Sequence, residues 1–205
     1  MALKAVLFDM DGTLVDSIPA WHATFNHVLR LQGMSEITYE RFCADILGQS
    51  IEKDIETFFP HLTVEGLKSS YKAHFPKYLG GVELFPETPK VLEYLEQKGL
   101  KKGIVTNTPR DLMFLTLDKV GLSGRFESAL GGDDVTVGKP DPEIIVKSLK
   151  EMGVDRKDAL MVGDTNADMN AGKRANVKTV GVGIQGDWMV GGIGELPRLL
   201  EQIGK

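Results

Sequence analysis

The stretch Lys4-Ala-Val-Leu-Phe8 runs directly into Asp9-Met-Asp-Gly12, so that a short apolar run ends in two closely spaced carboxylates. A run of this length and composition is typical of a buried β-strand. Similar runs occur at 102–106, 159–163 and 178–182, with a weaker one at 128–131. Stretches with helical spacing separate them. Strands that alternate with helices indicate an α/β fold, so we predict a doubly wound, Rossmann-like parallel sheet with helices on both faces.

The pattern changes between Asp16 and Gly80, where strand-like runs disappear. The first apolar residues of this segment recur at helical spacing, on one face of a predicted helix: Ile18, Trp21, Phe25, Val28 and Leu29. Three further helices are predicted at 40–47, 51–58 and 64–78. We interpret the segment as an α-helical domain, residues 15–81, inserted into a core made of residues 1–14 and 82–205.

The composition is that of a globular protein with one or two domains: 205 residues, 42% apolar, 26% charged and a net charge of −5. The single cysteine, Cys43, excludes an intramolecular disulfide and a cysteine-rich zinc module. The acidic balance and the lack of a basic stripe argue against nucleic-acid binding. Apolar runs are too short for a membrane span, and the first residues do not resemble a secretory signal. We therefore predict a cytoplasmic protein with no membrane partner.

Polar residues follow the predicted strands at the points where these end. Asp9 and Asp11 follow the first strand, and Thr106 and Asn107 follow the second. In a parallel sheet, ligands bind beyond the carboxyl ends of the strands. The topology is therefore expected to gather four carboxylates, a hydroxyl and a lysine at one edge: Asp9, Asp11, Asp164, Asp168, Thr106 and Lys139.

Such a cluster needs a cation, because closely packed carboxylates repel one another and are costly to bury unpaired. With no cysteine or histidine close to these residues in the sequence, a hard ion with oxygen ligands is the natural partner, and we predict Mg²⁺. Mg²⁺ usually keeps waters and shares its coordination shell with a substrate phosphate. The cluster therefore predicts a centre for phosphate chemistry.

Each of these residues also has a structural explanation when it is taken alone. Asp9 and Asp11 suit a turn, and Asp164 suits a helix N-cap. A solvated surface position would explain Lys139. The polar residues after the second strand, best of all Thr108, suit the cap of the following helix. The coincidence of all four segments at predicted strand ends is what favours a catalytic site.

The stretch Asp9-Met-Asp-Gly-Thr-Leu-Val-Asp16 resembles the first motif of the haloacid dehalogenase superfamily of phosphohydrolases. Thr106 resembles its second motif, Lys139 its third, and Gly163-Asp-Thr-Asn-Ala-Asp168 its fourth. The resemblance covers residues 1–14 and 82–185, and the helical segment resembles the cap that this family inserts between its first two motifs. The overall pattern is most similar to the phosphoglycolate phosphatase and β-phosphoglucomutase relatives.

This resemblance implies a Mg²⁺-dependent phosphatase for a small phosphorylated metabolite. For the oligomeric state, a monomer and a homodimer are both open. Asp9 is then the nucleophile that forms an aspartyl phosphate, and Asp11 is the general acid and later the general base. Thr106, the backbone amide of Asn107 and Lys139 bind the phosphoryl group. The implied metal ligands are Asp9, the backbone carbonyl of Asp11, Asp164 and Asp168, the last directly or through water.

An aspartate at position 11 favours an oxygen leaving group, and so a phosphate ester over a carbon–halogen or carbon–phosphorus bond. A phosphosugar mutase is the enzymatic alternative. Against it, Gly163-Asp164 with a second aspartate at Asp168 resembles the phosphatase form of the fourth motif, and Trp21 stands where mutase-like members carry a histidine.

An aspartate-phosphorylated signalling receiver is the alternative from another class. It would need its phosphoacceptor on a middle strand and no inserted helical domain. His22 and Lys53, in the helical segment, are candidate substrate contacts. Residues 181–186 match G-x-G-x-x-G, but too little chain follows for a dinucleotide-binding unit, so we interpret them as a flexible loop at a strand end.

Overall fold

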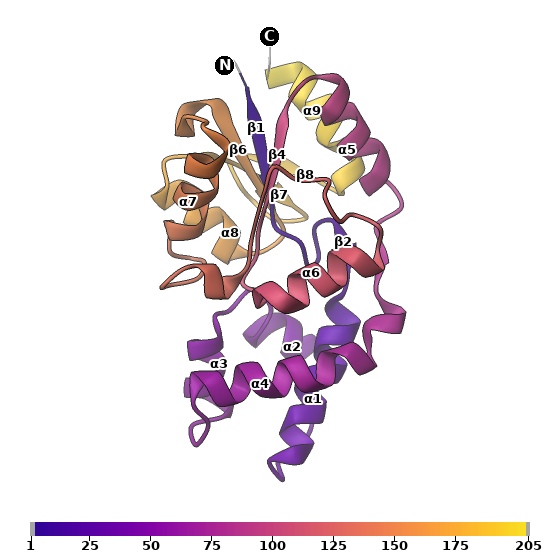
Figure 1. Ribbon diagram of the computed structural model, residues 1–205, viewed down its shortest axis with the longest axis vertical. Coiled ribbons are helices and arrows are strands. Elements are labelled where there is room, and N and C mark those ends of the chain that lie inside the picture. Colours follow the sequence, from indigo (N-terminus) through magenta and orange to yellow (C-terminus); the bar gives the residue numbers. More distant parts are fainter. Residues whose placement is uncertain (1–2, 204–205) are drawn as a thin grey trace.

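A computed structural model describes residues 3–203, so residues 1–2 and 204–205 of the predicted core lie outside the described residues. Its main sheet has the strand order β5-β4-β1-β6-β7-β8, and every neighbouring pair is parallel (Figure 1). The strands are β1 (Ala5–Phe8), β4 (Lys101–Val105), β5 (Ser128–Leu130), β6 (Ala159–Gly163), β7 (Lys178–Val182) and β8 (Trp188–Val190). The predicted parallel α/β sheet is confirmed.

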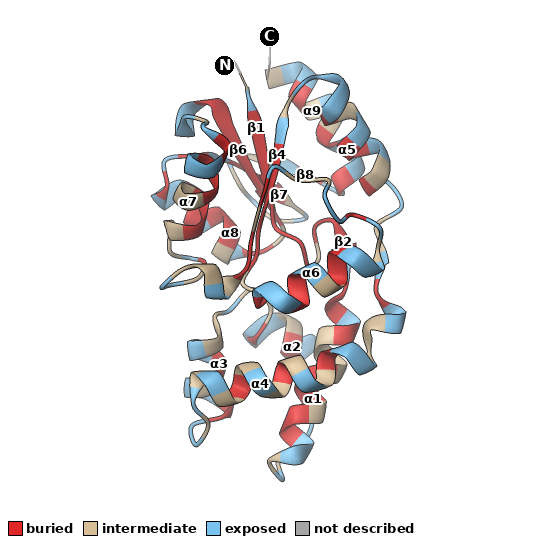
Figure 2. Ribbon diagram, in the orientation of Figure 1, coloured by how far each residue is buried: buried red, intermediate tan, exposed pale blue. Residues whose placement is uncertain are grey.

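Helices cover both faces of this sheet, as expected for a doubly wound fold. Val6 and Phe8 of β1 pack with apolar residues of α5 (Thr88–Gln97), α6 (Arg110–Lys119) and α9 (Leu196–Ile203). Ala5 and Leu7 pack instead with α7 (Glu143–Met152) and α8 (Asn166–Arg174). Alternate residues of a strand point to opposite faces, which is why one strand serves two cores. Figure 2 shows the sheet buried between the two helical layers.

The segment between residues 17 and 81 is helical and lies beyond the carboxyl ends of the strands (Figure 1). It contains α1 (Ile18–Leu31), α2 (Tyr39–Asp45), α3 (Ile51–Phe58) and α4 (Val64–His74). The ring of Phe25 packs against Phe42, Phe58 and Phe59, with ring centroids 5.2–5.7 Å apart. From here on, the helical segment means residues 17–81, which are the predicted domain 15–81 without Val15 and Asp16, because these two residues form a strand.

The prediction of one helix over 64–78 is wrong at its C-terminal end. The α-helix ends at His74, and Phe75–Lys77 form a short 3₁₀ turn, followed by a second one at Leu79–Gly81. Pro76 contributes to the break, because proline offers no N–H for the helical ladder.

The two passages of the chain between sheet and helical segment lie side by side. β2 (Val15–Asp16) pairs antiparallel with β3 (Glu83–Leu84) in a small ribbon of its own. The hydroxyl of Thr88 donates to the backbone carbonyl of Leu14 at 2.8 Å, which ties the ribbon to α5. Both ends of the helical segment are therefore anchored at one place.

The strand β8 was not expected from the sequence. It adds to the edge of the sheet beside β7, and the connection is held by the Asp187 carboxylate. This carboxylate accepts hydrogen bonds from the backbone N–H and the hydroxyl of Thr179, both at 3.0 Å. The stretch 181–186 thus leads into a further strand and not into the helix that a dinucleotide-binding unit requires.

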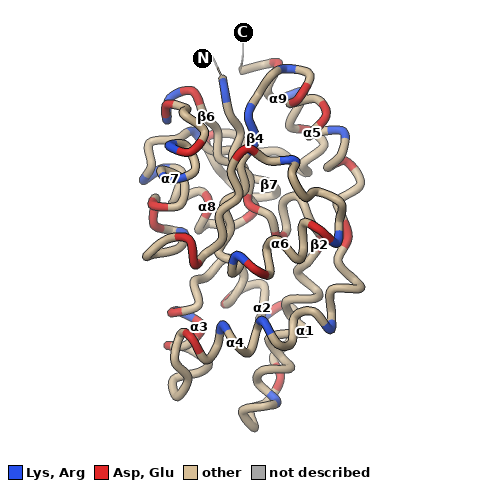
Figure 3. Tube along the Cα trace, viewed as in Figure 1, with Lys and Arg blue, Asp and Glu red and all other residues tan. Residues whose placement is uncertain are grey.

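Acidic and basic residues are interspersed over core and helical segment in the view of Figure 3. One of their ion pairs joins the two parts: Lys72 of α4 lies 2.8 Å from Asp111 of α6. Among the described residues, no helix has both the length and the apolar character needed to cross a membrane.

Candidate active site

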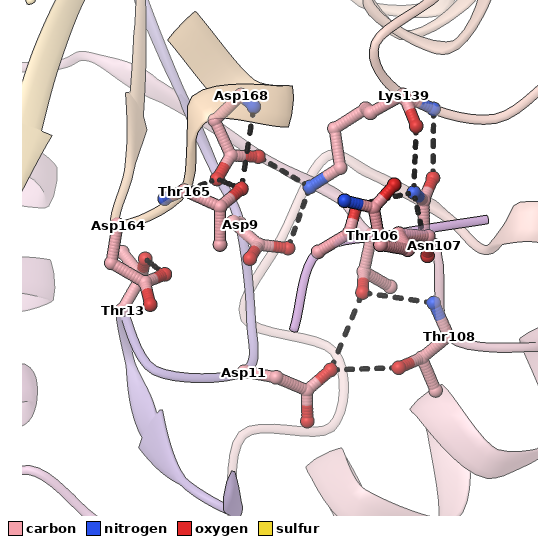
Figure 4. A network of polar contacts seen from close by, with 12 residues as sticks. Asp9, Asp11, Thr13, Thr106, Asn107, Thr108, Lys139, Asp164, Thr165 and Asp168 are labelled. Atoms are coloured by element: carbon pink, nitrogen blue, oxygen red, sulfur yellow. Dashed lines mark hydrogen bonds and ion pairs between the residues drawn. The ribbon is translucent and has the colours of Figure 1, made fainter. Parts of the chain in front are cut away.

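A buried lysine connects the ends of two strands at the carboxyl edge of the sheet. Lys139 Nζ donates to Asp9 Oδ1 at 2.7 Å and to Asp168 Oδ1 at 2.6 Å (Figure 4). Asp9 directly follows β1, Asp168 lies in the first turn of α8, and Lys139 comes from the loop before α7. The lysine is only 2% exposed. The alternative of a solvated surface lysine is therefore wrong.

Three carboxylates meet beside this lysine. Each of Asp9, Asp164 and Asp168 contributes one oxygen, and these atoms all lie within 4.8 Å of one another. The hydroxyl of Thr13 donates to Asp164 Oδ1 at 2.7 Å. Asp164 is not the N-cap of α8, contrary to the structural alternative, because that position belongs to Thr165.

Thr165 and Asp168 fix each other in a capping box. The N–H and hydroxyl of Thr165 donate to Asp168 Oδ2 at 3.0 and 2.6 Å, so the carboxylate is held on two sides. One oxygen bonds the helix N-terminus and the other bonds Lys139. The orientation of Asp168 is therefore set by local helix chemistry.

The pKa values of these groups report the crowding. Burial raises the pKa of Asp9 well above its usual value; Asp168 and Asp164 add to the rise, and the Lys139 ammonium opposes it. Burial, reinforced by Asp168, raises the pKa of Asp164 to about 7. Burial alone would lower the pKa of Lys139, but the two carboxylates that it bonds outweigh burial and raise it. One ammonium does not balance three carboxylates, and carboxylate oxygens are the ligands of hard divalent cations, so the donor set fits such an ion.

The carboxylate of Asp11 accepts hydrogen bonds from both parts of the chain, the core and the helical segment. From the core, the hydroxyl of Thr108 donates to its Oδ2 at 2.7 Å. From the helical segment, Ser17 Oγ and Trp21 Nε1 donate to its Oδ1 at 2.5 and 3.0 Å. Thr106 Oγ1 lies 3.4 Å from Oδ2. Thr108 is not the predicted helix cap, because α6 begins after Pro109 without a side-chain cap.

Asn107 holds two loops together through its side chain. Its Nδ2 donates to the backbone carbonyls of Lys139 and Gly48 at 2.8 and 3.2 Å, and its Oδ1 accepts from the N–H of Lys139 at 2.8 Å. The sequence pointed to the backbone amide of Asn107 and missed this role of the carboxamide. The helical segment is thereby docked on the loop that carries the buried lysine.

Two glycines allow the close approach of backbone at the site. Gly12 has a φ of +81°, and a Cβ there would lie 2.3 Å from Asp164 Oδ2. Gly48 has a φ of +77°, and a Cβ there would lie 2.8 Å from the side chain of Thr165. Side chains rarely adopt this backbone conformation, so both positions require glycine for two reasons.

A cavity of about 90 Å³ lies between the core and the helical segment. Five residues predicted for the site are among those that line it: Asp9, Asp11, Thr106, Asn107 and Lys139. Asp164 and Asp168 are not among the lining residues and lie in the carboxylate cluster. The volume is well below the roughly 300–1,000 Å³ of sites for drug-sized ligands, so the cavity suits a small molecule.

Neither candidate contact in the helical segment is among the described residues that line the cavity. His22 Nε2 lies 2.9 Å from the backbone carbonyl of Ile37, and Lys53 is exposed and pairs with Glu56 at 3.0 Å. Instead, Trp21, Asp54 and Tyr71 line it. The sequence contained a signal for Asp54, because this acidic residue lies on the apolar face of the helix 51–58, together with Ile51, Ile55 and Phe58.

A doubly wound sheet that gathers buried charges at its carboxyl edge is characteristic of α/β enzymes. Residues 6–182 match the family described as haloacid dehalogenase-like hydrolase. The chain belongs to this family, as its motifs indicated.

Two relatives with named activities are similar over most of their length. A phosphoglycolate phosphatase of Aquifex aeolicus is 35% identical over 180 residues, which are 86% of this chain and 83% of the relative. A pyrophosphatase of Oceanobacillus iheyensis is 30% identical over 185 residues, 89% and 84% of the two chains. The crystal structure of a hydrolase from Pseudomonas syringae has a TM-score of 0.78 at 25% identity, covering 87% of this chain and 83% of that one.

The chain is thus an enzyme, a hydrolase of the phosphatase class, as predicted. The match to a hydrolase family gives no support to the signalling receiver. Strand position alone would not have decided this question, because β1 lies between β4 and β6 in the middle of the sheet.

Proposed function

We propose that this hydrolase is a Mg²⁺-dependent phosphatase that cleaves a phosphomonoester of a small metabolite through an aspartyl phosphate on Asp9. The observation that carries the proposal is the pair of ion pairs made by Lys139 at the edge of the cavity. Its Nζ lies 2.7 Å from Asp9 Oδ1 and 2.6 Å from Asp168 Oδ1. The implied ligands of the ion are Asp9, Asp164, Asp168 and the backbone carbonyl of Asp11. Bound Mg²⁺ would neutralise phosphoryl oxygens and orient them for in-line attack.

Asp9 is the nucleophile in the first step. A carboxylate and a phosphate repel each other, and the Lys139 ammonium on Asp9 Oδ1 reduces this repulsion while it holds the carboxylate in place. A bond forms between Asp9 and phosphorus, and the bond from phosphorus to the ester oxygen breaks. Thr106 and the backbone amide of Asn107 bind the transferring phosphoryl oxygens, since both residues line the cavity beside Asp9.

Asp11 moves the protons of both steps. In the first step it gives a proton to the departing ester oxygen. In the second step it takes a proton from the water that attacks phosphorus, and the bond between phosphorus and Asp9 breaks. The hydrogen bonds from Thr108, Ser17 and Trp21 hold its carboxylate in place at the cavity, which Asp11 lines.

We also propose that residues 1–14 and 82–205 form the catalytic core and that residues 15–81 form a cap that closes over it. The two passages of the chain, at 14–17 and 78–81, are the proposed hinges. Their position beside the β2–β3 ribbon supports a single axis of movement. The contacts of Asn107 with Gly48 would form on closure and exclude water from the cavity.

Phosphate release from small phosphomonoesters, measured with and without Mg²⁺, tests the proposal. Asp9→Asn is expected to lower the rate by more than about 10⁴-fold while the protein keeps its melting temperature within a few degrees. Asp118→Asn, an exposed aspartate on α6, is the matched control and should remain fully active. Activity of Asp9→Asn within about tenfold of the wild type would refute the nucleophile, and full activity in excess chelator would refute the metal.

A further inference from the structure

The helical segment contributes a buried aspartate and a tyrosine, joined by a hydrogen bond, to the lining of the cavity. Tyr71 of α4 donates its hydroxyl to Asp54 Oδ2 of α3 at 3.0 Å, and both residues line the cavity. Asp54 is 6% exposed and Tyr71 is 4% exposed. No step of the proposed mechanism uses either group, so the presence of a carboxylate at this place needs another explanation.

The second oxygen of this carboxylate is unpaired. Asp54 Oδ1 is buried and has no hydrogen-bond partner among the described residues. An unpaired carboxylate oxygen is costly to bury, and that cost disappears when a ligand donates a hydrogen bond to it. Burial raises the pKa of Asp54 to about 7, with Glu52 adding to the rise and the Tyr71 hydrogen bond opposing it. A donor in the cavity would therefore stabilise the ionised form near neutral pH.

The rest of this wall offers an anion no free cation among the described residues, although the uncharged carboxamide of Gln49 also lines it. Lys139 is the cation among the described residues that line the cavity, and it is already bonded to Asp9 and Asp168. The helical segment supplies mostly apolar lining residues: Phe25, Phe42, Ile46, Leu47 and Ile51. A leaving group with its own negative charge would meet the Asp54 carboxyl there without a counter-charge.

The geometry points to a substrate whose leaving group is an uncharged or cationic alcohol. This alcohol has a terminal group that donates a hydrogen bond to Asp54, and it carries no negative charge. This inference rests on the proposed phosphatase function and names its substrate class. It also separates this chain from the activities for which two relatives are named, since phosphoglycolate and pyrophosphate both have anionic leaving groups.

A matched series of two-carbon phosphates tests the inference, because its members differ only at the group remote from phosphorus. The series is 2-hydroxyethyl phosphate, 2-aminoethyl phosphate, ethyl phosphate and phosphoglycolate. For the wild type with Mg²⁺ we expect the hydroxyl and ammonium compounds to have the highest kcat/KM and phosphoglycolate the lowest. This ranking needs no variant, so it holds as a test whether or not a variant folds.

Variants of Asp54 then assign the preference to one side chain. Asp54→Asn keeps the shape and removes the charge, so the preference for 2-aminoethyl over ethyl phosphate should fall by about 10- to 100-fold, while relative activity on phosphoglycolate rises. Asp54→Leu removes the acceptor and should also abolish the preference for 2-hydroxyethyl phosphate. Glu56→Gln, on the same helix but exposed, is the control for net charge and should leave the ranking unchanged.

Two outcomes separate this inference from the proposal on which it rests. If phosphoglycolate is the best substrate of the wild type, or if Asp54→Asn leaves the ranking unchanged, the inference is overturned and the phosphatase stands. If neither the series nor p-nitrophenyl phosphate releases phosphate, the proposed function falls and the inference falls with it.

Discussion

The core and the helical segment build the two walls of one cavity, and they treat charge differently. On the core side, Asp9, Lys139 and Asp168 are all buried, and each has a charged partner within 2.7 Å. On the helical side, the wall is mainly apolar, and the buried carboxylate of Asp54 keeps an oxygen that has no partner in the part of the chain that the structure describes. The core wall therefore holds its groups fixed for a reaction, whereas the helical wall leaves a group available for an occupant.

The comparison teaches how reaction and selectivity can be separated in one chain. Every phosphate ester presents the same phosphoryl group, so the wall that binds it can be rigid. Leaving groups differ, so the wall that meets them carries the features that discriminate. Asp11 stands between the two, because it accepts hydrogen bonds from Thr108 of the core and from Ser17 and Trp21 of the helical segment.

The largest effect in this comparison is expected from Asp11→Asn, which removes the group that both walls hold. An amide can neither give a proton to a leaving alkoxide nor take one from water, so turnover of an alkyl phosphate should fall by about 10²–10⁴-fold. p-Nitrophenyl phosphate has a leaving group that hardly needs a proton. With it, the first step should continue and the second should fail, so that phosphoryl enzyme accumulates on Asp9.

Mass spectrometry after rapid acid quench would detect the added phosphoryl group. Mg²⁺ affinity, measured by calorimetry, is the control, because only the backbone carbonyl of Asp11 is proposed as a ligand. Wild-type turnover of both substrates would contradict the acid–base role, and so would a loss of Mg²⁺ binding.

Much of the core could be predicted because its signals are local. The strands at 159–163 and 178–182 were predicted with the observed bounds, because each contains a short run of buried residues, which spans all of the first and positions 179–181 of the second. The strand β8 was missed because it depends on pairing with β7 at the edge of the sheet. The meeting of polar residues at one sheet edge followed from topology alone.

What could not be predicted comes from contacts between distant parts of the chain. The donors on Asp11 come from position 108 as well as from 17 and 21, and no local pattern links them. Asp54 was visible as an acidic residue on an apolar helix face, but only the packing of α3 against α4 brings it to Tyr71 and the cavity. Side chains that follow strands were thus easier to assign than side chains that line the facing wall.

A smaller effect, on stability, should distinguish the unpaired acid of the helical wall from the paired acids of the core. In the folded protein the pKa of Asp54 is about 7, raised by burial from an ordinary value of 3.8. A raised pKa of an acid stabilises the fold at low pH, and this contribution is lost as the pH rises toward and past 7. Asp54→Asn escapes that loss, so its advantage in unfolding free energy over the wild type should grow by about 2–3 kcal/mol between pH 5 and pH 8.

Chemical denaturation of both proteins at each pH measures this difference, and the titration of the core carboxylates cancels because the two proteins share them. Glu56→Gln should show no such trend, because Glu56 is exposed. An advantage of Asp54→Asn that is the same at pH 5 and pH 8 would mean that the carboxyl is not protonated in the fold.

The smallest expected effect tests whether the helical wall also acts on the reaction through Asp11. Trp21 stacks on Phe75, with ring centroids 4.3 Å apart, and its Nε1 donates to Asp11 at 3.0 Å. Trp21→Phe keeps an aromatic ring for the stack and removes only the donor. Because Ser17 and Thr108 still hold the carboxylate, the loss should be that of one hydrogen bond, about 3- to 10-fold in kcat for an alkyl phosphate. The aryl substrate should lose less in its first step, since it needs no proton there, and burst kinetics measure that step separately. Trp188→Phe, which changes the other tryptophan at the edge of the sheet, should alter neither rate. Equal losses in the first step for alkyl and aryl substrates would show that Trp21 contributes to packing alone. The helical wall would then have no part, through Trp21, in the acid–base role of Asp11.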